Sequence, residues 1–428
     1  MMNSIDWKNR LLSGDYDEKL SYIYACKADE TQKYKERLIE VIDSLEENFG
    51  HKDDIRLFSA PGRTEIGGNH TDHQRGAVLA ASINLDIVAA AAKNGTNKVR
   101  ILSKGYSVDV LNVNELDIHT EEYDKAISLI RGVLKCFADR GYKLEGFDVY
   151  TMSDVLKGSG MSSSAAFEVV VGTVVNGLFA NNEVSAIEIA QMGKFAENVY
   201  YNKPSGLMDQ MASSVGNVVS IDFKSEEKPV VKKVEFDFTN SGHSLCIIDS
   251  GADHADLTDE YAAVTREMRA VSNYFGKEVL SDVDTDEFYA DLAGVRKSVG
   301  NDRAILRAIH FFNDTKRAKA EAKALEDGNF DEFLKLIKES GYSSFMYLQN
   351  IYAAPKPTEQ AMSLALAMCE KLLAGRGAYR VHGGGFAGTV QAFVPNDMLD
   401  MFKREMDAVL GDGMCHILAI RPVGGCEF

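Results

Sequence analysis

A run rich in glycine and serine, residues 157–166, constrains what this chain can fold into more than any other part of its sequence. It follows a predicted strand at Phe147–Met152 and leads into an apolar stretch typical of a buried helix. Glycines let the backbone curl so that several N–H groups point at one anion, and the start of the following helix adds positive potential. The spacing fits neither the dinucleotide-binding nor the Walker pattern. We therefore expect a phosphate-binding loop of another kind, and a plain glycine turn with a serine N-cap is the alternative.

A second segment, Ala60–Gln74, gathers an arginine, acids, an amide and two histidines in a stretch bounded by proline and glycines. Loops of this kind carry binding groups on a rigid scaffold. The side chains of Asn69, His70 and Asp72 together could hold several hydroxyls of a polyol. The alternatives are a solvated turn, or a cation held between His70 and His73.

Two further segments combine small residues with a chemically distinct feature. In Ser205–Met211 a single acid, Asp209, stands in an apolar and small-residue run, where it is either an N-cap or a buried functional carboxylate. In His382–Thr389 a glycine cluster lies between two short predicted strands. Such a cluster indicates close approach of the backbone to a ligand or to another strand.

Composition narrows the classes of protein that remain. The 428 residues suffice for about two or three domains, and 47 basic against 64 acidic residues give a formal net charge of −17. A surface this acidic disfavours nucleic acid and anionic lipid, although a local pocket could still hold a small anion. The six cysteines form no CxxC pair, the first residues lack a signal-peptide pattern, and the apolar stretch at 77–92 is too short and polar to cross a bilayer. We therefore expect a cytoplasmic protein with reduced thiols and with no nucleic-acid or membrane partner.

Periodicity and turn signals divide the chain into three expected parts. Residues 1–50 form a helical N-terminal extension that packs on the body or mediates self-association, because Ile39, Ile42 and Leu45 recur at helical spacing. A charged, turn-prone break at Phe223–Pro229 separates a domain at 51–225 from a second domain at 226–428. The other expected elements are helices at Ser185–Asn198 and over 255–345, a buried strand at Ser244–Asp249, and short strands at Tyr379–His382 and Thr389–Val394.

Taken together and in this order, the segments resemble the motifs of the GHMP small-molecule kinases, and within them the galactokinase family. The first signature of that family is similar to Pro61–Gln74, and its phosphate loop is similar to Gly158–Ala165 with Met161 in the usual Leu position. Its catalytic segment is similar to Gly206–Gln210 with Leu207 in the Ile position, and its glycine turn to Gly383–Gly388 with one change, Ala387. The resemblance implies an α+β fold of two domains, an N-terminal domain like domain 2 of ribosomal protein S5 and a ferredoxin-like C-terminal domain, with the site between them.

The resemblance also implies an activity and the residues that perform it. The activity is ATP-dependent phosphorylation of a sugar at its C1 hydroxyl, with Mg²⁺ as the metal and with a monomer or a weak homo-oligomer both left open. The catalytic aspartate falls on Asp209, with Arg63 beside it, and the magnesium ligands fall on Ser164 and Glu197. The sugar contacts fall on Asn69, His70, Asp72, Gly206 and Tyr261, and the ATP contacts on Gly158, Ser159, Gly160, Met161, Ser162, Ser163 and Ser164.

Departures from the family pattern leave the sugar open. The family usually has Glu at the position of Asn69, Asn at that of Glu65 and Tyr at that of His73. In galactokinases that Glu contacts the distal hydroxyl of the sugar, and Asn69 could still hydrogen-bond it without a charge. We therefore expect a galactose 1-kinase, with galacturonate or an amino-galactose as the alternative substrate. A catalytically inactive sugar sensor is disfavoured because Arg63 and Asp209 are both present.

Overall fold

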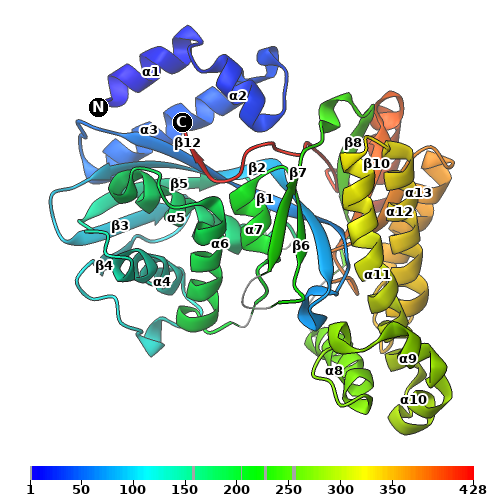
Figure 1. Ribbon diagram of the computed structural model, residues 1–428. Helices are drawn as coiled ribbons and strands as arrows, with labels where there is room; N and C mark the ends of the chain where they lie inside the picture. Colours follow the sequence, from blue (N-terminus) through cyan, green and yellow to red (C-terminus); the bar gives the residue numbers. More distant parts are fainter. Residues whose placement is uncertain (1, 157–159, 204, 226–228, 253–256) are drawn as a thin grey trace.

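The N-terminal extension folds into helices, as expected from its periodicity. The computed structural model describes residues 2–156, 160–203, 205–225, 229–252 and 257–428. The helices α1 (Ser4–Ser13), α2 (Asp17–Tyr24) and α3 (Gln32–Phe49) lie along the outer face of a large sheet (Figure 1, blue). Buried side chains such as Leu38 and Val41 pack there against Val88 and Tyr150 of the sheet. The extension therefore covers one face of the main body.

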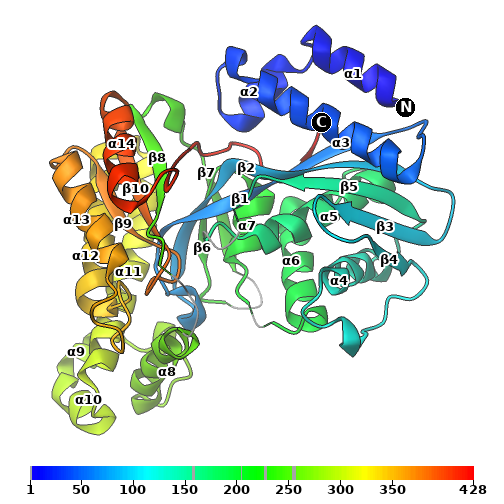
Figure 2. The same ribbon diagram turned by 180° about the vertical axis from the view of Figure 1, so that it is seen from behind.

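A mixed eight-stranded sheet forms the centre of the first body. Its main order is β12-β1-β2-β5-β3-β4, with β6 and β7 attached beside β2. Its strands are β1 (Arg56–Gly67), β2 (Ala77–Lys93), β3 (Lys98–Ser103), β4 (Asp109–Asn112), β5 (Phe147–Ser153), β6 (Val218–Asp222), β7 (Val230–Val234) and β12 (Cys426–Glu427). The apolar stretch at 77–92 belongs to β2, which is buried on both faces because helices cover the sheet from both sides (Figures 1 and 2).

The inner face of this sheet is covered by the helices that carry the candidate site. They are α4 (Ala126–Asp139), α5 (Ser163–Ala180), α6 (Ala186–Phe195), which continues into a π-turn, η4 (Ala196–Tyr200), and α7 (Met208–Val215). Among the described residues α5 alone is long and apolar enough to suit a membrane span. Most of α5 is buried against β1, β2 and the neighbouring helices, as in the core helix of a folded domain.

The second body is built on a four-stranded antiparallel sheet, β11-β8-β10-β9. This order is that of a ferredoxin-like domain, as expected. Its strands are β8 (His243–Asp249), β9 (Ala378–His382), β10 (Thr389–Pro395) and β11 (Cys415–Leu418). Helices α13 (Ala361–Leu373) and α14 (Leu399–Leu410) pack on one face, and α11 (Asp302–Glu326) and α12 (Phe330–Ser343) on the other. The remaining helices, α8 (Thr258–Tyr274), α9 (Thr285–Ala290) and α10 (Leu292–Val299), form a separate cluster beside α11.

The structure differs from the expected division of the chain in two places. Strand β7 follows the charged break but still belongs to the first sheet, so the passage to the second body comes after Val234. The C-terminal segment then returns to the first body, where β12 pairs with β1 and Arg421 forms a buried ion pair with Asp86. The β12–β1 pairing joins distant segments and leaves no local signal in the sequence. Strand β7, in contrast, pairs antiparallel with β6 just before the charged break, so that break separates two neighbouring strands of one sheet and not the two bodies.

The segment expected to be a loop after Ala60 is instead a continuation of β1 as far as Gly67. Its pairing with β2 shifts register between Pro61 and Arg63, and again between Glu65 and Gly67. Between these irregularities Arg63 and Glu65 stand on a regular strand, so both side chains project from the same face. On that face Arg63 contacts Asp209 of α7, and Glu65 contacts Arg380 of β9 in the second body.

Candidate active site

An arginine–aspartate pair brings together two distant parts of the chain. Arg63 on β1 donates from Nε to Asp209 Oδ1 at 2.7 Å and from Nη2 to Oδ2 at 2.9 Å, across 146 positions in the sequence. Asp209 lies in the first turn of α7, where a carboxylate is favoured by the helix dipole. The Arg63 side chain is 9% exposed and that of Asp209 is 32% exposed, so the aspartate remains open to a pocket.

The charge state of Asp209 is fixed by its neighbours. Burial by itself would raise the pKa of this carboxyl, but the charge and hydrogen bonds of Arg63 and a hydrogen bond from Ser162 outweigh it, so the pKa lies below its usual range. Arg63 in turn stays protonated: burial opposes the charged form, but the Asp209 carboxylate raises its pKa. The pair is therefore an ionised carboxylate held by a permanent cation.

The described part of the expected phosphate loop contacts this pair. Ser162 has a left-handed backbone (φ 54°) at the start of α5, and its hydroxyl donates to Asp209 Oδ2. Arg63 donates from its backbone N–H to the Met161 carbonyl at 3.1 Å and from its side chain to the carbonyl of Gly160. Ser163 and Ser164 form the first turn of α5, whereas Gly158 and Ser159 lie outside the described residues. A phosphate on the start of α5 would thus lie next to Asp209.

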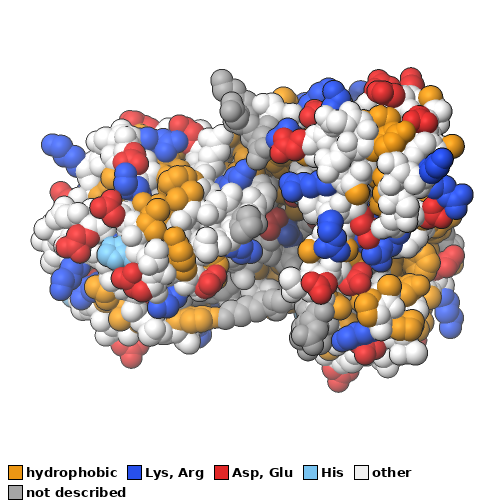
Figure 3. Space-filling view, turned by 90° about the horizontal axis from the view of Figure 1, so that it is seen from below, with side chains coloured by type: hydrophobic (Ala, Val, Ile, Leu, Met, Phe, Trp, Pro, Cys, Tyr) orange, Lys and Arg blue, Asp and Glu red, His pale blue; other side chains and the backbone are white. Residues whose placement is uncertain are grey.

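A small polar pocket of about 270 Å³ opens beside the pair, and both bodies line it. Seen from below, the molecule is hollowed between its two lobes (Figure 3). The lining residues are Arg63, Glu65, His70, Asp72, His73, Glu197, Lys203, Ser205, Gly206, Met208, Asp209, Gln210, Gly383 and Gly384. The expected site residues His70, Asp72, Gly206 and Glu197 are therefore brought together with the Arg63–Asp209 pair.

Glu197 is held on the pocket wall by three partners. Its Oε1 pairs with Lys203 Nζ at 2.7 Å, and its Oε2 accepts from Ser205 Oγ at 2.6 Å and from Gln210 Nε2 at 2.8 Å. The same Gln210 amide donates to Glu168 at 2.9 Å. Burial, and next the nearby Glu197 charge, raise the pKa of Glu168 well above its usual range. Ser205 and Gln210 lie in the segment identified from the sequence but were given no role there, and Lys203 lies outside every motif that the sequence offered.

The two histidines of the first signature bond to each other. His70 Nε2 lies 2.8 Å from the Gly384 carbonyl, and His73 Nε2 lies 3.4 Å from His70 Nδ1. Burial, and next the neighbouring His70, lower the pKa of His73 to about 3, so His73 is neutral. Burial raises the pKa of Asp72, whose Oδ2 comes so close to Gly206 that a Cβ there would lie 3.0 Å away. Among the described residues no group of three or more His, Cys, Asp and Glu could hold a metal ion, so the cation alternative gains no support.

Asn69 and Tyr261 do not line the pocket, in contrast to the other expected sugar contacts. Asn69 is fully buried and uses all of its side-chain hydrogen-bonding capacity within the protein. Its Nδ2 donates to Glu65 at 2.8 Å and to the Gly383 carbonyl at 2.7 Å, and its Oδ1 accepts from Asn350 at 2.8 Å and from a serine hydroxyl at 3.4 Å. Tyr261 donates to the Gly385 carbonyl at 2.8 Å. Both residues therefore support the glycine turn from behind.

The glycine cluster at Gly383–Gly388 serves close backbone approach, as expected. Gly385 has φ +80°, and a Cβ there would lie 2.1 Å from the carbonyl oxygen of Asn350. A Cβ on Gly384 would lie 2.5 Å from the ring of Tyr261. The turn therefore packs closely against Asn350 and Tyr261 of its own body, while Gly383 and Gly384 line the pocket.

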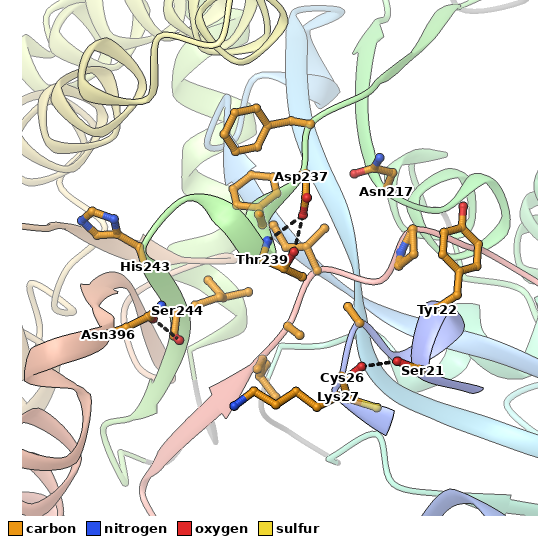
Figure 4. A pocket seen from close by; sticks show the side chains of 18 of the residues that line it. Ser21, Tyr22, Cys26, Lys27, Asn217, Asp237, Thr239, His243, Ser244 and Asn396 are labelled. Carbon is orange, nitrogen blue, oxygen red and sulfur yellow. Dashed lines mark hydrogen bonds between the residues drawn. The ribbon is translucent and has the colours of Figure 1, made fainter. Parts of the chain in front are cut away.

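A larger hollow of about 910 Å³ lies elsewhere, between α2, the chain after β7 and the start of β8 (Figure 4). Its polar side chains are largely paired with one another. Asp237 accepts from the Thr239 backbone at 2.9 Å, and Ser244 donates to Asn396 at 2.8 Å. The side chains suited to proton transfer and to stabilising a phosphate, Asp209 and Arg63, therefore line the smaller pocket.

Comparisons with known proteins show similarity to one family of kinases. Residues 43–93 match the galactokinase galactose-binding signature, and residues 128–217 match the GHMP kinases N-terminal domain. A curated relative named galactokinase, from Glaesserella parasuis, is 29% identical over 370 residues, which are 84% of this chain and 90% of that protein. The crystal structure of Lactococcus lactis galactokinase complexed with galactose has a TM-score of 0.77 at 23% identity, covering 92% of this chain and 100% of that chain. Methanococcus jannaschii mevalonate kinase has a TM-score of 0.61 at 15% identity, covering 85% and 98%.

Proposed function

The chain belongs to the galactokinase family of the GHMP kinases, and we propose that it transfers the γ-phosphoryl group of ATP to the C1 hydroxyl of D-galactose. The observation that carries the proposal is the Arg63–Asp209 pair, which lies between a small polar pocket and the start of α5. A sugar in the pocket and a phosphate at the helix start would meet at this pair.

Phosphoryl transfer needs positioning and charge stabilisation more than covalent help from the protein. In the proposed reaction Asp209 accepts a hydrogen bond from the C1 hydroxyl and receives its proton as the oxygen attacks the γ-phosphorus. The bond from that phosphorus to the bridging oxygen breaks, and ADP leaves. Arg63 keeps Asp209 ionised and stabilises negative charge on the transferring group. The N–H groups at the start of α5 bind the phosphates.

Ser164 and Glu197 are the residues that would hold Mg²⁺. A hydroxyl and a carboxylate are oxygen donors of the kind this ion prefers, and Mg²⁺ commonly completes its shell with water and phosphate oxygens. Glu197 already accepts the cationic head of Lys203 at 2.7 Å, so its carboxylate is oriented to receive a positive charge. When bound, the ion would neutralise phosphate charge.

The test is Asp209→Asn, assayed by coupled detection of ADP with galactose as acceptor. Removing the proton acceptor is expected to lower kcat by about 10²–10⁴-fold. Tm should fall as well, because the ion pair with Arg63 is lost. Asp302→Asn is the matched control, because Asp302 forms a bidentate pair of the same geometry with Arg296 on the surface (2.8 and 2.9 Å). Near wild-type turnover by Asp209→Asn would show that this carboxylate does not take part in the reaction.

A further inference from the structure

Asn69 stands where the family pattern has a glutamate, but the same signature carries a carboxylate four residues earlier, at Glu65. Asn69 is saturated by hydrogen bonds within the protein, so it offers no donor or acceptor to a substrate. Glu65, in contrast, lines the pocket. Its Oε1 accepts from Asn69 Nδ2 at 2.8 Å and from Arg380 Nη2 at 2.9 Å. Its Oε2 accepts no hydrogen bond from the described residues, which leaves that oxygen to a ligand.

The position of Glu65 relative to the reaction centre suits a hexose. Arg63 and Glu65 are two residues apart on a regular strand, so their Cα atoms are about 6.5–7 Å apart on one face. A sugar ring whose C1 hydroxyl meets the Arg63–Asp209 pair would therefore bring its other hydroxyls along the strand toward Glu65. Arg380 is fully buried behind Glu65 and fixes its carboxylate, with Asn69 as the second support.

The charges that line the pocket disfavour an anionic sugar. Carboxylates come from Glu65, Asp72, Asp209 and Glu197, whereas the lysine and arginine on the wall are each already paired with one of these acids. His73 is neutral, because burial lowers its pKa to about 3. A uronate carboxylate near Glu65 would meet the carboxylate itself, because the partner of Glu65, Arg380, is buried behind it. No uncommitted lysine or arginine stands among the described lining residues to pair with the uronate.

We propose that Glu65 is the specificity-determining residue of this pocket: its Oε2 accepts hydrogen bonds from sugar hydroxyls and its charge excludes uronic acids. The inference rests on the proposed kinase function and deepens it. Asn69 and Arg380 act as positioning residues for this carboxylate, and the substrate class is neutral or amino hexoses of the galactose type.

The first experiment uses the wild-type protein. We expect kcat/KM for galactose to exceed that for galacturonate by at least tenfold, and the neutral amide of galacturonate to be phosphorylated at least tenfold better than the acid. If galacturonate is preferred, or the amide is no better than the acid, the inference about Glu65 is overturned while the kinase function stands. If no sugar is phosphorylated, the proposed function itself fails.

The second experiment compares Glu65→Gln with the wild type. The variant keeps the shape and loses the charge, so the preference for galactose over galacturonate is expected to narrow at least tenfold, through KM more than kcat. A purely structural role would lower both activities together and leave their ratio unchanged, which would contradict the proposal. The comparison of galacturonate with its amide needs no variant, so it decides the matter even if Glu65→Gln unfolds.

Discussion

Replacing Arg63 by methionine should separate its electrostatic role from its bulk. The variant removes both hydrogen bonds to Asp209 and the side-chain bond to the Gly160 carbonyl but keeps a similar length. Loss of one preorganised donor at a reacting centre costs about 2.7–4 kcal/mol, so kcat is expected to fall about 10²–10³-fold. Arg63→Lys, which keeps the charge but not the bidentate geometry, should fall less.

The pH dependence gives the sharper test of the same change. In the wild type the pKa of Asp209 lies below its usual range because Arg63 outweighs burial, so the stabilisation by this pair is present at neutral pH and is lost as pH falls through that low pKa. In Arg63→Met the arginine no longer opposes the effect of burial, so the pKa of Asp209 rises. The acid limb of the kcat/KM profile should therefore appear at higher pH than in the wild type. The Tm difference from wild type should also grow as pH is raised from acid to neutral. An unchanged acid limb and a pH-independent Tm difference would refute this reasoning.

Three further changes test other parts of the structure. Asp86→Asn weakens a fully buried carboxylate that holds two arginines, and removing one partner of such a cluster should cost about 3–5 kcal/mol in a denaturant unfolding experiment; an unchanged midpoint would contradict the ion-pair assignment. Gly385→Ala forces a Cβ to within 2.1 Å of the Asn350 carbonyl at φ +80°, so Tm and activity should both fall, and a variant with wild-type Tm would mean that the turn is looser than described. Glu168→Gln should keep most activity, because burial raises the pKa of Glu168 well above its usual range and the amide keeps its shape, whereas Glu197→Gln should lose activity because it removes the partner of Lys203; equal losses in steady-state assays would contradict this distinction.

The sequence predicted much of the fold where local pattern decides structure. The amphipathic repeat before Phe49, the helix after Ser163 and the strands around the glycine turn were all placed correctly. Strand β2 was not identified, because a strand covered on both faces reads as a continuous apolar stretch without alternation. The position of β12 depends on pairing with β1, far away in the sequence, which no local window contains. Strand β7 pairs with its sequence neighbour β6 and was missed because the charged break before it was interpreted as a domain junction.

The candidate site, too, was predicted from the sequence only in part. The motifs that carry Arg63 and Asp209 identified a pair that the structure joins, although 146 positions separate the two residues. The surroundings of Asn69 could not be read from its own segment, since the amide that saturates its Oδ1 comes from Asn350, 281 residues away. The same holds for Glu65, whose supporting arginine is 315 residues away and whose charge was noted only as a departure from a family pattern.

The most direct measurement is a structure of the protein with galactose and a non-hydrolysable ATP analogue. We expect the C1 oxygen of the sugar within hydrogen-bonding distance of the Asp209 carboxylate, and the γ-phosphate over the start of α5 beside Arg63. A sugar bound with its C1 oxygen turned away from Asp209, or a nucleotide bound elsewhere, would contradict the central claim that this pair is where phosphoryl transfer takes place.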